Sequence, residues 1–275
     1  MTGSVTGAWV LVDDLATATG GPPDAAGQMA ADLAMLDAVA AGGPPVLRLY
    51  RWDPPALSLG RFQPEDDVDR AACAARGVDV VRRPTGGRAL LHGADLTYSA
   101  AFPQPPGDAG RVDALYEWLA GGLIAGLARL GVHAAVARND GPAGPVCFAG
   151  QQGADLRVGE RKLCGSAQVR RDGAVLQHGS ILLGRLSFDE TNLLRPRPGV
   201  PPTTRAELRA ATVTLGELGA PTDPSVVADA LVEGFVASLD LTFDLTVDLT
   251  VTPGFTLQSS PRPSPRVQAS SARRG

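Results

Sequence analysis

The chain has 275 residues, of which 44% are hydrophobic and 5% aromatic, so we expect a core built mainly from Leu, Val and Ala. Its formal net charge of −4 argues against binding to nucleic acid or to an anionic membrane. Asp13 and Asp14 interrupt the only apolar run near the N-terminus, and no run reaches the length of a membrane span. Three cysteines do not suggest a disulfide framework, so we expect a protein of the reducing cytoplasm.

The first half of the chain predicts helices and short strands in irregular order. A helix follows the Gly/Pro/Ala-rich loop at 17–26, with an apolar face made of Met29, Leu33, Leu36 and Val39 or Ala40. The glycine and proline run at 42–45 ends this helix. Further strands are predicted at 46–50, 56–60, 78–83 and 96–102, and further helices at 66–76 and 111–130.

The second half contains a strong hairpin signal, because Asp172-Gly173 separates two strand-like segments at 162–171 and 174–183. The turn predicts three cross-strand pairs, Arg171 with Ala174, Ala167 with His178, and Ser166 with Gly179. A helix at 225–239 precedes an alternating strand that begins at Leu241. The Ser/Pro/Arg-rich tail from Ser259 onward is expected to be disordered. Hairpins mixed with helices favour an α+β fold with a largely antiparallel sheet flanked by helices.

The loop at 82–88 is the first segment with chemical potential. Gly86 and Gly87 follow a strand and let backbone amides approach a ligand, while the flanking arginines favour an anionic or carbonyl-bearing group. A tight turn with solvated arginines is the simpler interpretation. The chain has no P-loop motif, and its His and Cys spacing does not match a zinc site. His92 and His178 are therefore hydrogen-bonded structural residues by default.

The chain keeps a single lysine, Lys162, among 25 basic residues. A nearby ammonium lowers the pKa of a thiol and so makes it a better nucleophile. Cys147 follows a Gly/Pro loop fifteen residues before this lysine, and Cys164 is a rival because strand alternation puts it on the same face as Lys162. A cysteine is more often a small packing residue than a nucleophile, and Cys73 in an alanine-rich helix is the plainest example.

Several of these segments together resemble the biotin/lipoate protein ligase and lipoyl/octanoyl transferase superfamily. The matching segments are 27–32, 52–60, 82–92, 96–99, 147–148, 161–168 and 176–180. Within the superfamily, the chain is most similar to the octanoyltransferases of many Gram-positive bacteria. The resemblance covers roughly residues 27–240, which it implies are a catalytic domain. The patterns outside this range predict an N-terminal strand and loop at 1–26, a strand extension at 241–258 and a disordered tail at 259–275.

The resemblance also implies roles for individual residues. It assigns the covalent acyl carrier to Cys147 and the lowering of its thiol pKa to Lys162, whereas the position of Cys164 is usually alanine in this group. The residues that it places at the acyl site are Arg83, Thr85, Gly86, Gly87, His92, Gly165, Ser166, Ala167, His178 and Gly179. The chain departs from the usual His-Asp-x-Glu-Leu pattern, because His92 is followed by Gly93 and Ala94. We therefore expect one acidic group to be missing beside the pocket.

The implied reaction moves an octanoyl group from acyl carrier protein to a lysine of an acceptor, through a cysteine thioester and without a nucleotide, metal or other cofactor. The acceptor is the glycine cleavage H protein or a lipoyl domain of a 2-oxoacid dehydrogenase, and the enzyme is expected to be a monomer. Arginines around Lys162 form either a docking face for acidic carriers or an ordinary solvated surface. An ATP-dependent lipoate–protein ligase and a non-catalytic acyl-binding protein are the alternatives.

Overall fold

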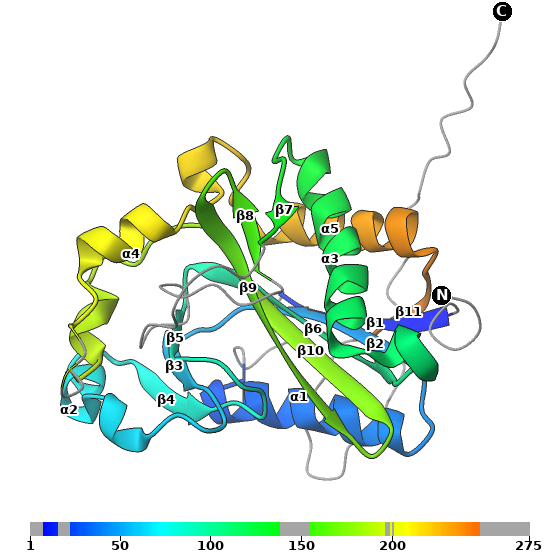
Figure 1. Cartoon of the computed structure of the whole chain (residues 1–275), viewed down its shortest axis with the longest axis horizontal. Coiled ribbons are helices and arrows are strands. Elements are labelled where there is room, and N and C mark those ends of the chain that lie inside the picture. The colour runs from blue at the N-terminus through cyan, green and yellow to red at the C-terminus, as the bar shows by residue number, and fades with distance from the viewer. Residues whose placement is uncertain (1–7, 16–22, 138–154, 196–198, 200, 248–275) are drawn as a thin grey trace, which may run out of the picture.

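The computed structural model describes residues 8–15, 23–137, 155–195, 199 and 201–247, and side chains as far as Phe243. Its main feature is an eight-stranded sheet in the order β11-β1-β2-β6-β10-β9-β8-β7 (Figure 1). The strands of this sheet are β1 (Ala8–Asp14), β2 (Val46–Tyr50), β6 (Asp95–Pro103), β7 (Ala135–Val136), β8 (Leu156–Val158), β9 (Arg161–Arg171), β10 (Ala174–Leu182) and β11 (Thr242–Val247). Every pairing in it is antiparallel except those of β1 with β2 and with β11. The prediction of an α+β fold with a largely antiparallel sheet is confirmed.

The long β9–β10 hairpin has the predicted register. Arg171 pairs with Ala174, Ala167 with His178, and Ser166 with Gly179. Asp172 and Gly173 form the turn with φ angles of 52° and 76°. Positive φ at both central residues is the requirement of the two-residue turn that matches the twist of a hairpin. The local turn chemistry therefore fixes which side chains of β10 face the pocket described below.

Helices cover both faces of the large sheet. On one face, α3 (Val112–Arg129) and α5 (Pro224–Leu239) pack on a core that includes Leu49, Phe102 and Val175. On the other face lies α1 (Ala25–Ala40), which packs on alternate residues of the same strands (Figure 1). The alternation is that of a strand buried on both sides, since successive side chains point to opposite faces.

A second, three-stranded sheet lies on the α1 side, in the order β4-β3-β5. Its strands are β3 (Ala56–Leu59), β4 (Asp79–Arg82) and β5 (Leu90–His92). The short helix α2 (Arg70–Ala74) packs under it, and α4 (Arg205–Ala211) follows β10 in the chain. None of the helices in the described part of the chain is long and apolar enough to cross a membrane.

Two details differ from the sequence-based prediction. Leu33 of α1 is only partly buried, whereas Asp32 and Met35 are buried. The helix turns a polar side chain toward the sheet because Asp32 finds charged partners there. The predicted helix at 66–76 is split into a short 3-10 turn (Glu65–Asp67) and α2. The division into four regions remains a prediction, and the tail from Ser259 lies outside the described residues.

Candidate active site

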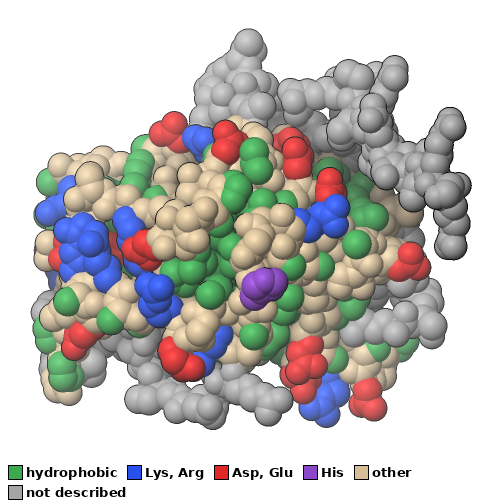
Figure 2. Space-filling model, turned by 90° about the horizontal axis from the view of Figure 1, so that it is seen from above, with side chains coloured by type: hydrophobic (Ala, Val, Ile, Leu, Met, Phe, Trp, Pro, Cys, Tyr) green, Lys and Arg blue, Asp and Glu red, His purple; other side chains and the backbone are tan. Residues whose placement is uncertain are grey.

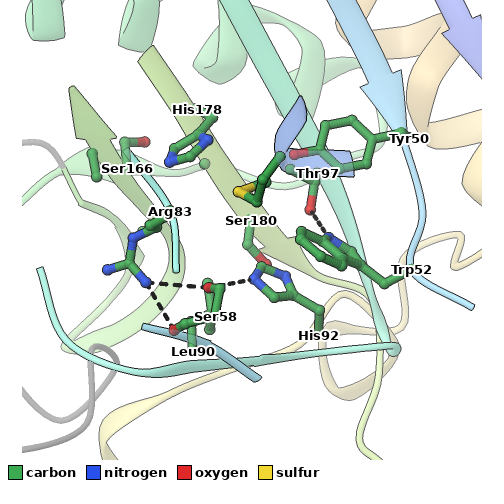
Figure 3. A pocket seen from close by; sticks show the side chains of 14 residues that line it. Tyr50, Trp52, Ser58, Arg83, Leu90, His92, Thr97, Ser166, His178 and Ser180 are labelled. Carbon is green, nitrogen blue, oxygen red and sulfur yellow. Dashed lines mark hydrogen bonds between the residues drawn. The ribbon is translucent and has the colours of Figure 1, made fainter. Parts of the chain in front are cut away.

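A pocket with an empty volume of about 370 Å³ lies between the two sheets and α1, and its surface is almost entirely apolar. The pocket is lined by Met29, Tyr50, Trp52, Ser58, Arg83, Leu90, His92, Thr97, Gly165, Ser166, Ala167, His178, Gly179 and Ser180 (Figure 3). An apolar hollow with a few polar groups on its wall fits a small acyl chain better than a charged ligand.

His92 is held from three sides. Its Nδ1 atom lies 2.8 Å from Oδ2 of Asp95, and its Nε2 atom lies 2.9 Å from Oγ of Ser58. The ring stacks on Trp52 with the ring centres 4.2 Å apart, which Figure 3 shows as two neighbouring planes. Burial alone would raise the pKa of Asp95, but the charge and hydrogen bond of His92, with a hydrogen bond from Ser180, hold that pKa below its usual value. His92 therefore has an acidic partner at the start of β6, while Gly93 brings no acidic side chain to this part of the pocket.

His178 has the same arrangement on the other side of the pocket. Its Nδ1 atom lies 2.9 Å from Oδ2 of Asp32, and its Nε2 atom lies 2.6 Å from Oγ1 of Thr85. Asp32 also accepts hydrogen bonds from Arg48 (3.1 Å) and from the hydroxyl of Tyr50 (3.1 Å). Burial would raise the pKa of Asp32, and the hydrogen bond and charge of His178, with the charge of Arg48, lower it below the usual value. Asp32 is thus an ionised anchor for the histidine.

The guanidinium of Arg83 is used to shape the Gly-Gly loop. It donates to the carbonyl oxygens of Gly86 (2.8 Å), Arg88 (2.7 Å) and Ser58 (3.0 Å). Arg83 is 5% exposed, so most of its donors face protein rather than a ligand. The sequence suggested that this arginine attracts an anionic or carbonyl-bearing ligand, whereas here its guanidinium donates to backbone carbonyl oxygens of the protein. Its role at the pocket wall is to fix the loop.

Lys162 is buried beside Gly165, a residue of the pocket wall, and forms an ion pair with Asp155. Nζ lies 2.7 Å from Oδ2 of Asp155, and the two side chains are only 4% and 2% exposed. The ammonium lies over Gly165, because a Cβ at that position would be 3.1 Å from Nζ. Glycine is therefore needed here so that the lysine can lie against the pocket wall. A buried cation with a carboxylate partner is a common element of catalytic sites.

The three cysteines differ in what the structure says about them. Cys147 lies outside the described residues, as does its contact with Lys162 that the sequence predicts. Cys164 is fully buried in the core under α3 and α5 and does not line the pocket. Cys73 is buried under the small sheet, and burial raises the pKa of its thiol. Neither described cysteine offers a thiolate to the pocket.

Most of the residues that the resemblance placed at the acyl site lie on its wall. These are Arg83, His92, Gly165, Ser166, Ala167, His178 and Gly179. Thr85, Gly86 and Gly87 are not among the lining residues, although Thr85 contacts His178 and the carbonyl oxygen of Gly86 accepts from Arg83. Their assignment as substrate-binding residues remains a prediction.

Sequence reasoning missed the carboxylates behind the pocket and part of its lining. The missed residues are Met29, Asp32, Tyr50, Trp52, Ser58, Leu90, Asp95, Thr97, Asp155 and Ser180. Asp32 carried one usable signal, because an aspartate on the buried face of a helix needs a buried partner. Asp155 carried none, since nothing local links it to Lys162.

Three of the four arginines near Lys162 have partners in the described part of the chain, and the fourth, Arg161, is exposed. Arg157 pairs with Glu160, and Arg171 pairs with Asp37 and Asp172. Arg170 donates to the carbonyl oxygen of Gly110. The choice between a docking face for acidic carriers and an ordinary solvated surface remains a prediction.

Comparison with known proteins places these features in a family. Residues 24–236 match the family model described as the lipoyl protein ligase A/B catalytic domain. Among curated proteins, the chain is 42% identical over 232 residues to octanoyltransferase LipM of Kyrpidia tusciae, covering 80% of this chain and 85% of that one. It is 43% identical over 213 residues to octanoyltransferase LipM of Symbiobacterium thermophilum, covering 72% of this chain and 76% of that one.

Solved structures share the fold. Lipoate-protein ligase A bound with ATP superposes with a TM-score of 0.69 and 24% identity, covering 90% of each chain. A bi-partite lipoate protein ligase studied with its E2 lipoyl domain, from Thermoplasma acidophilum, gives 0.65 and 24% over 90% of this chain and 88% of that chain. At this level of identity the likeness establishes the architecture of the domain.

Proposed function

The chain belongs to the lipoyl protein ligase A/B catalytic domain family, and we propose that it is an octanoyltransferase of protein lipoylation. The observation that carries the proposal is the apolar pocket whose Gly165 wall lies against the buried ammonium of Lys162. The identity of 42–43% to two octanoyltransferases supports the same acyl group. The pocket holds the alkyl chain, and the lysine lies where the polar end of that chain leaves the apolar wall.

The first step is an exchange of thioesters. The thiolate of Cys147 attacks the carbonyl carbon of octanoyl-acyl carrier protein, and the tetrahedral intermediate expels the carrier thiolate, which takes up a proton. Support for Cys147 comes from the sequence match and from the burial of Cys73 and Cys164 away from the pocket. No nucleotide takes part, because the donor already carries an activated acyl group.

In the second step, the neutral amine of an acceptor lysine attacks the Cys147 thioester, expels the thiolate and loses a proton. Lys162 stabilises the thiolate that forms in both steps, and the Lys162–Asp155 pair gives the departing protons a path. The carboxylate of Asp155 offsets much of the positive charge of the Lys162 ammonium. Proton transfer by the pair therefore contributes more to catalysis than the electrostatic field of the ammonium does.

Backbone amides near Gly165-Ser166, on the pocket wall, or near Gly86-Gly87 hold the oxyanion. Arg83 fixes the carbonyl oxygen of Gly86, and in a planar trans peptide this turns the N–H of Gly87 the opposite way. A fixed amide donor aimed at a tetrahedral oxyanion is worth about 2.7–4 kcal/mol in other enzymes. His178 supports the loop from behind through Thr85.

The acceptor is a lipoyl-type domain, either of a 2-oxoacid dehydrogenase or of the glycine cleavage system. The proposal is tested by incubating the protein with octanoyl-acyl carrier protein without ATP and measuring its intact mass. We expect one octanoyl adduct that hydroxylamine removes, and this adduct is absent in Cys147→Ser but present in Cys164→Ser.

Transfer that requires ATP and free acid, with release of AMP, would overturn the proposal in favour of a ligase. Binding of the carrier without turnover would point to a non-catalytic acyl-binding protein. An adduct that survives in Cys147→Ser and disappears in Cys164→Ser would identify Cys164, in the buried core, as the nucleophile.

A further inference from the structure

A second cavity borders the acyl pocket. Its empty volume is about 400 Å³, and Leu90 lines both cavities. Its wall mixes apolar and polar groups, and its lining is Leu90, Leu91, Ala94, Asp95, Leu182, Gly184, Arg185, Leu186, Glu190 and Thr212. This mixture suits a ligand segment that carries amides rather than an alkyl chain.

A third cavity, of about 260 Å³, continues the second. The two share Arg185, Leu186 and Glu190, and the third adds Arg205 and Arg209 of α4. Seen from above, basic side chains gather at the end of the molecule where Figure 1 places α4 (Figure 2). The three hollows therefore form one series that runs from an apolar pocket to an arginine-rich end.

Two arginines at the arginine-rich end are available to bind an anionic group. Arg185 pairs with Glu217, and Asp189 accepts hydrogen bonds from the backbone and hydroxyl of Thr191. Arg205 and Arg209 form no ion pair with any residue in the described part of the chain. Glu190 faces all three arginines, and its burial raises the pKa of the carboxyl group. The local balance thus favours an anionic group between Arg205 and Arg209.

Lys162 lines neither of the first two cavities but contacts a wall residue of each at the boundary between them. Its ammonium lies over Gly165 of the acyl pocket. Its backbone pairs with Thr212, which lines the second cavity, and its carbonyl oxygen accepts from the amide of Val213. A thioester carbonyl at this boundary would have its alkyl chain on one side and its thiol arm on the other.

We propose that the second and third cavities hold the 4′-phosphopantetheine arm of the acyl donor, with its phosphate between Arg205 and Arg209. The inference rests on the proposed function and adds a binding site to it. An acylated arm has an alkyl end, an amide-bearing middle and an anionic end, in the same order as the apolar pocket, the mixed cavity and the arginines. The protein then recognises the prosthetic group itself in addition to the carrier domain.

The test compares two donors that differ only in the phosphate, octanoyl-4′-phosphopantetheine and octanoyl-pantetheine. The release of thiol in a single turnover, without acceptor, gives the second-order rate constant of enzyme acylation for each donor. We expect the wild-type protein to prefer the phosphorylated donor by at least about 10-fold, since the phosphate accepts charge-assisted hydrogen bonds from two guanidinium groups. The double variant Arg205→Gln/Arg209→Gln should lose most of this preference. Arg76→Gln, which changes an exposed arginine in the turn after α2 and away from the cavities, should keep it.

An equal preference in the double variant and the wild type would overturn the inference while the proposed function stands. Release of thiol from neither donor by the wild type would count against the proposed function instead. In that event, calorimetric titration with phosphopantetheine alone decides the inference, which requires binding that weakens about 10-fold or more in the double variant. Binding of AMP that phosphopantetheine does not displace would make the cleft a nucleotide site and overturn the proposal.

Discussion

The Nδ1 atom of His178 lies 2.9 Å from Oδ2 of Asp32, although 146 positions separate the two residues in the chain. The contact joins α1 to β10 across the floor of the pocket. His92 repeats the pattern with Asp95 at 2.8 Å, but over only three positions. In both cases the carboxylate binds Nδ1 and a hydroxyl group binds Nε2, so the two rings are fixed in orientation from behind.

Asp32→Asn should destabilise the fold strongly at neutral pH. The change leaves Arg48, which is fully buried, with one carboxylate partner fewer, and the amide keeps only one acceptor oxygen where Arg48, Tyr50 and His178 share two. Breaking a buried ion pair from one side costs about 3–5 kcal/mol. The free energy of unfolding from urea titration at pH 7 measures this loss.

The same variant has a predicted pH signature. The folded-state pKa of Asp32 lies below the usual 3.8, so its contribution is fully present above that pH and is lost as the pH falls through the lower folded value. In Asp32→Asn this part of the acid destabilisation should be missing. Asp113→Asn, which breaks an exposed pair with Arg111, should change stability much less at every pH. Equal losses in the two variants would contradict the prediction.

The contrast between the two histidines also explains what the sequence could predict. The β9–β10 register followed from the Asp172-Gly173 turn, because a two-residue hairpin leaves no freedom of alignment. The pairing of His178 with Asp32 depends on how α1 lies across strands that are distant in sequence. Local patterns carry no information about that placement.

Local sequence patterns likewise could not predict the strand pairing at the edge of the large sheet or the partner of Lys162. The alternation after Leu241 predicted a strand, but its parallel pairing with β1 is a matter of topology. The partner of Lys162 was likewise invisible, since Asp155 precedes β8 and Lys162 lies in β9. By contrast, the family motifs identified most of the pocket wall, because they are continuous in sequence.

A double-mutant cycle separates the contribution of the Lys162–Asp155 pair to stability from its contribution to catalysis. Asp155→Asn and Lys162→Met should each lower the free energy of unfolding by about 3–5 kcal/mol, because each leaves a buried charge without its counter-charge. The double variant should lose much less than the sum of the two. Urea titration of the four proteins measures the coupling.

Activity should not follow the stability of this series. The double variant regains stability but lacks the ammonium, so it should form the octanoyl adduct as poorly as Lys162→Met does. Intact mass after a fixed incubation gives the comparison. Wild-type adduct formation by the double variant would show that Lys162 has a structural role only.

Gly165→Ala should reduce activity with little loss of stability. The new Cβ would lie 2.9 Å from Cε and 3.1 Å from Nζ of Lys162, so the flexible end of the lysine must move. A displacement of about 1 Å at a reacting group costs up to about 100-fold in rate. We expect adduct formation to slow by at least about 10-fold while the free energy of unfolding changes by less than about 1.5 kcal/mol.

Gly179→Ala is the matched comparison on the neighbouring strand. Its Cβ would meet Cε1 of Tyr98 at 2.5 Å and the carbonyl oxygen of Gly165 at 2.7 Å. Neither group can move without disturbing the sheet, so this variant should lose stability first. If both variants lose stability alike, the lysine does not lie against the pocket wall as described.

Glu190→Gln should stabilise the protein at neutral pH. Burial raises the pKa of this carboxyl group above its usual 4.5, more than the nearby arginines lower it. A raised folded-state pKa means that the favourable contribution is present below 4.5 and is lost as the pH rises through the folded value. The amide carries no charge to lose, so the variant should have the higher Tm at pH 7, and the difference should vanish as the pH falls below 4.5.

Glu217→Gln removes the same charge nearby and should have the opposite sign. Hydrogen bonds from Arg185 hold the pKa of Glu217 below 4.5, so its contribution is present at neutral pH and is lost on acidification. The Tm of Glu217→Gln at pH 7 should therefore be lower than that of the wild type. A change of the same sign in both variants would mean that net charge, rather than the local contacts of each carboxylate, controls stability at the arginine-rich end. Because Glu190 lies beside the proposed phosphate position, Glu190→Gln should also bind phosphopantetheine more tightly at pH 7, which calorimetry can measure on the same samples.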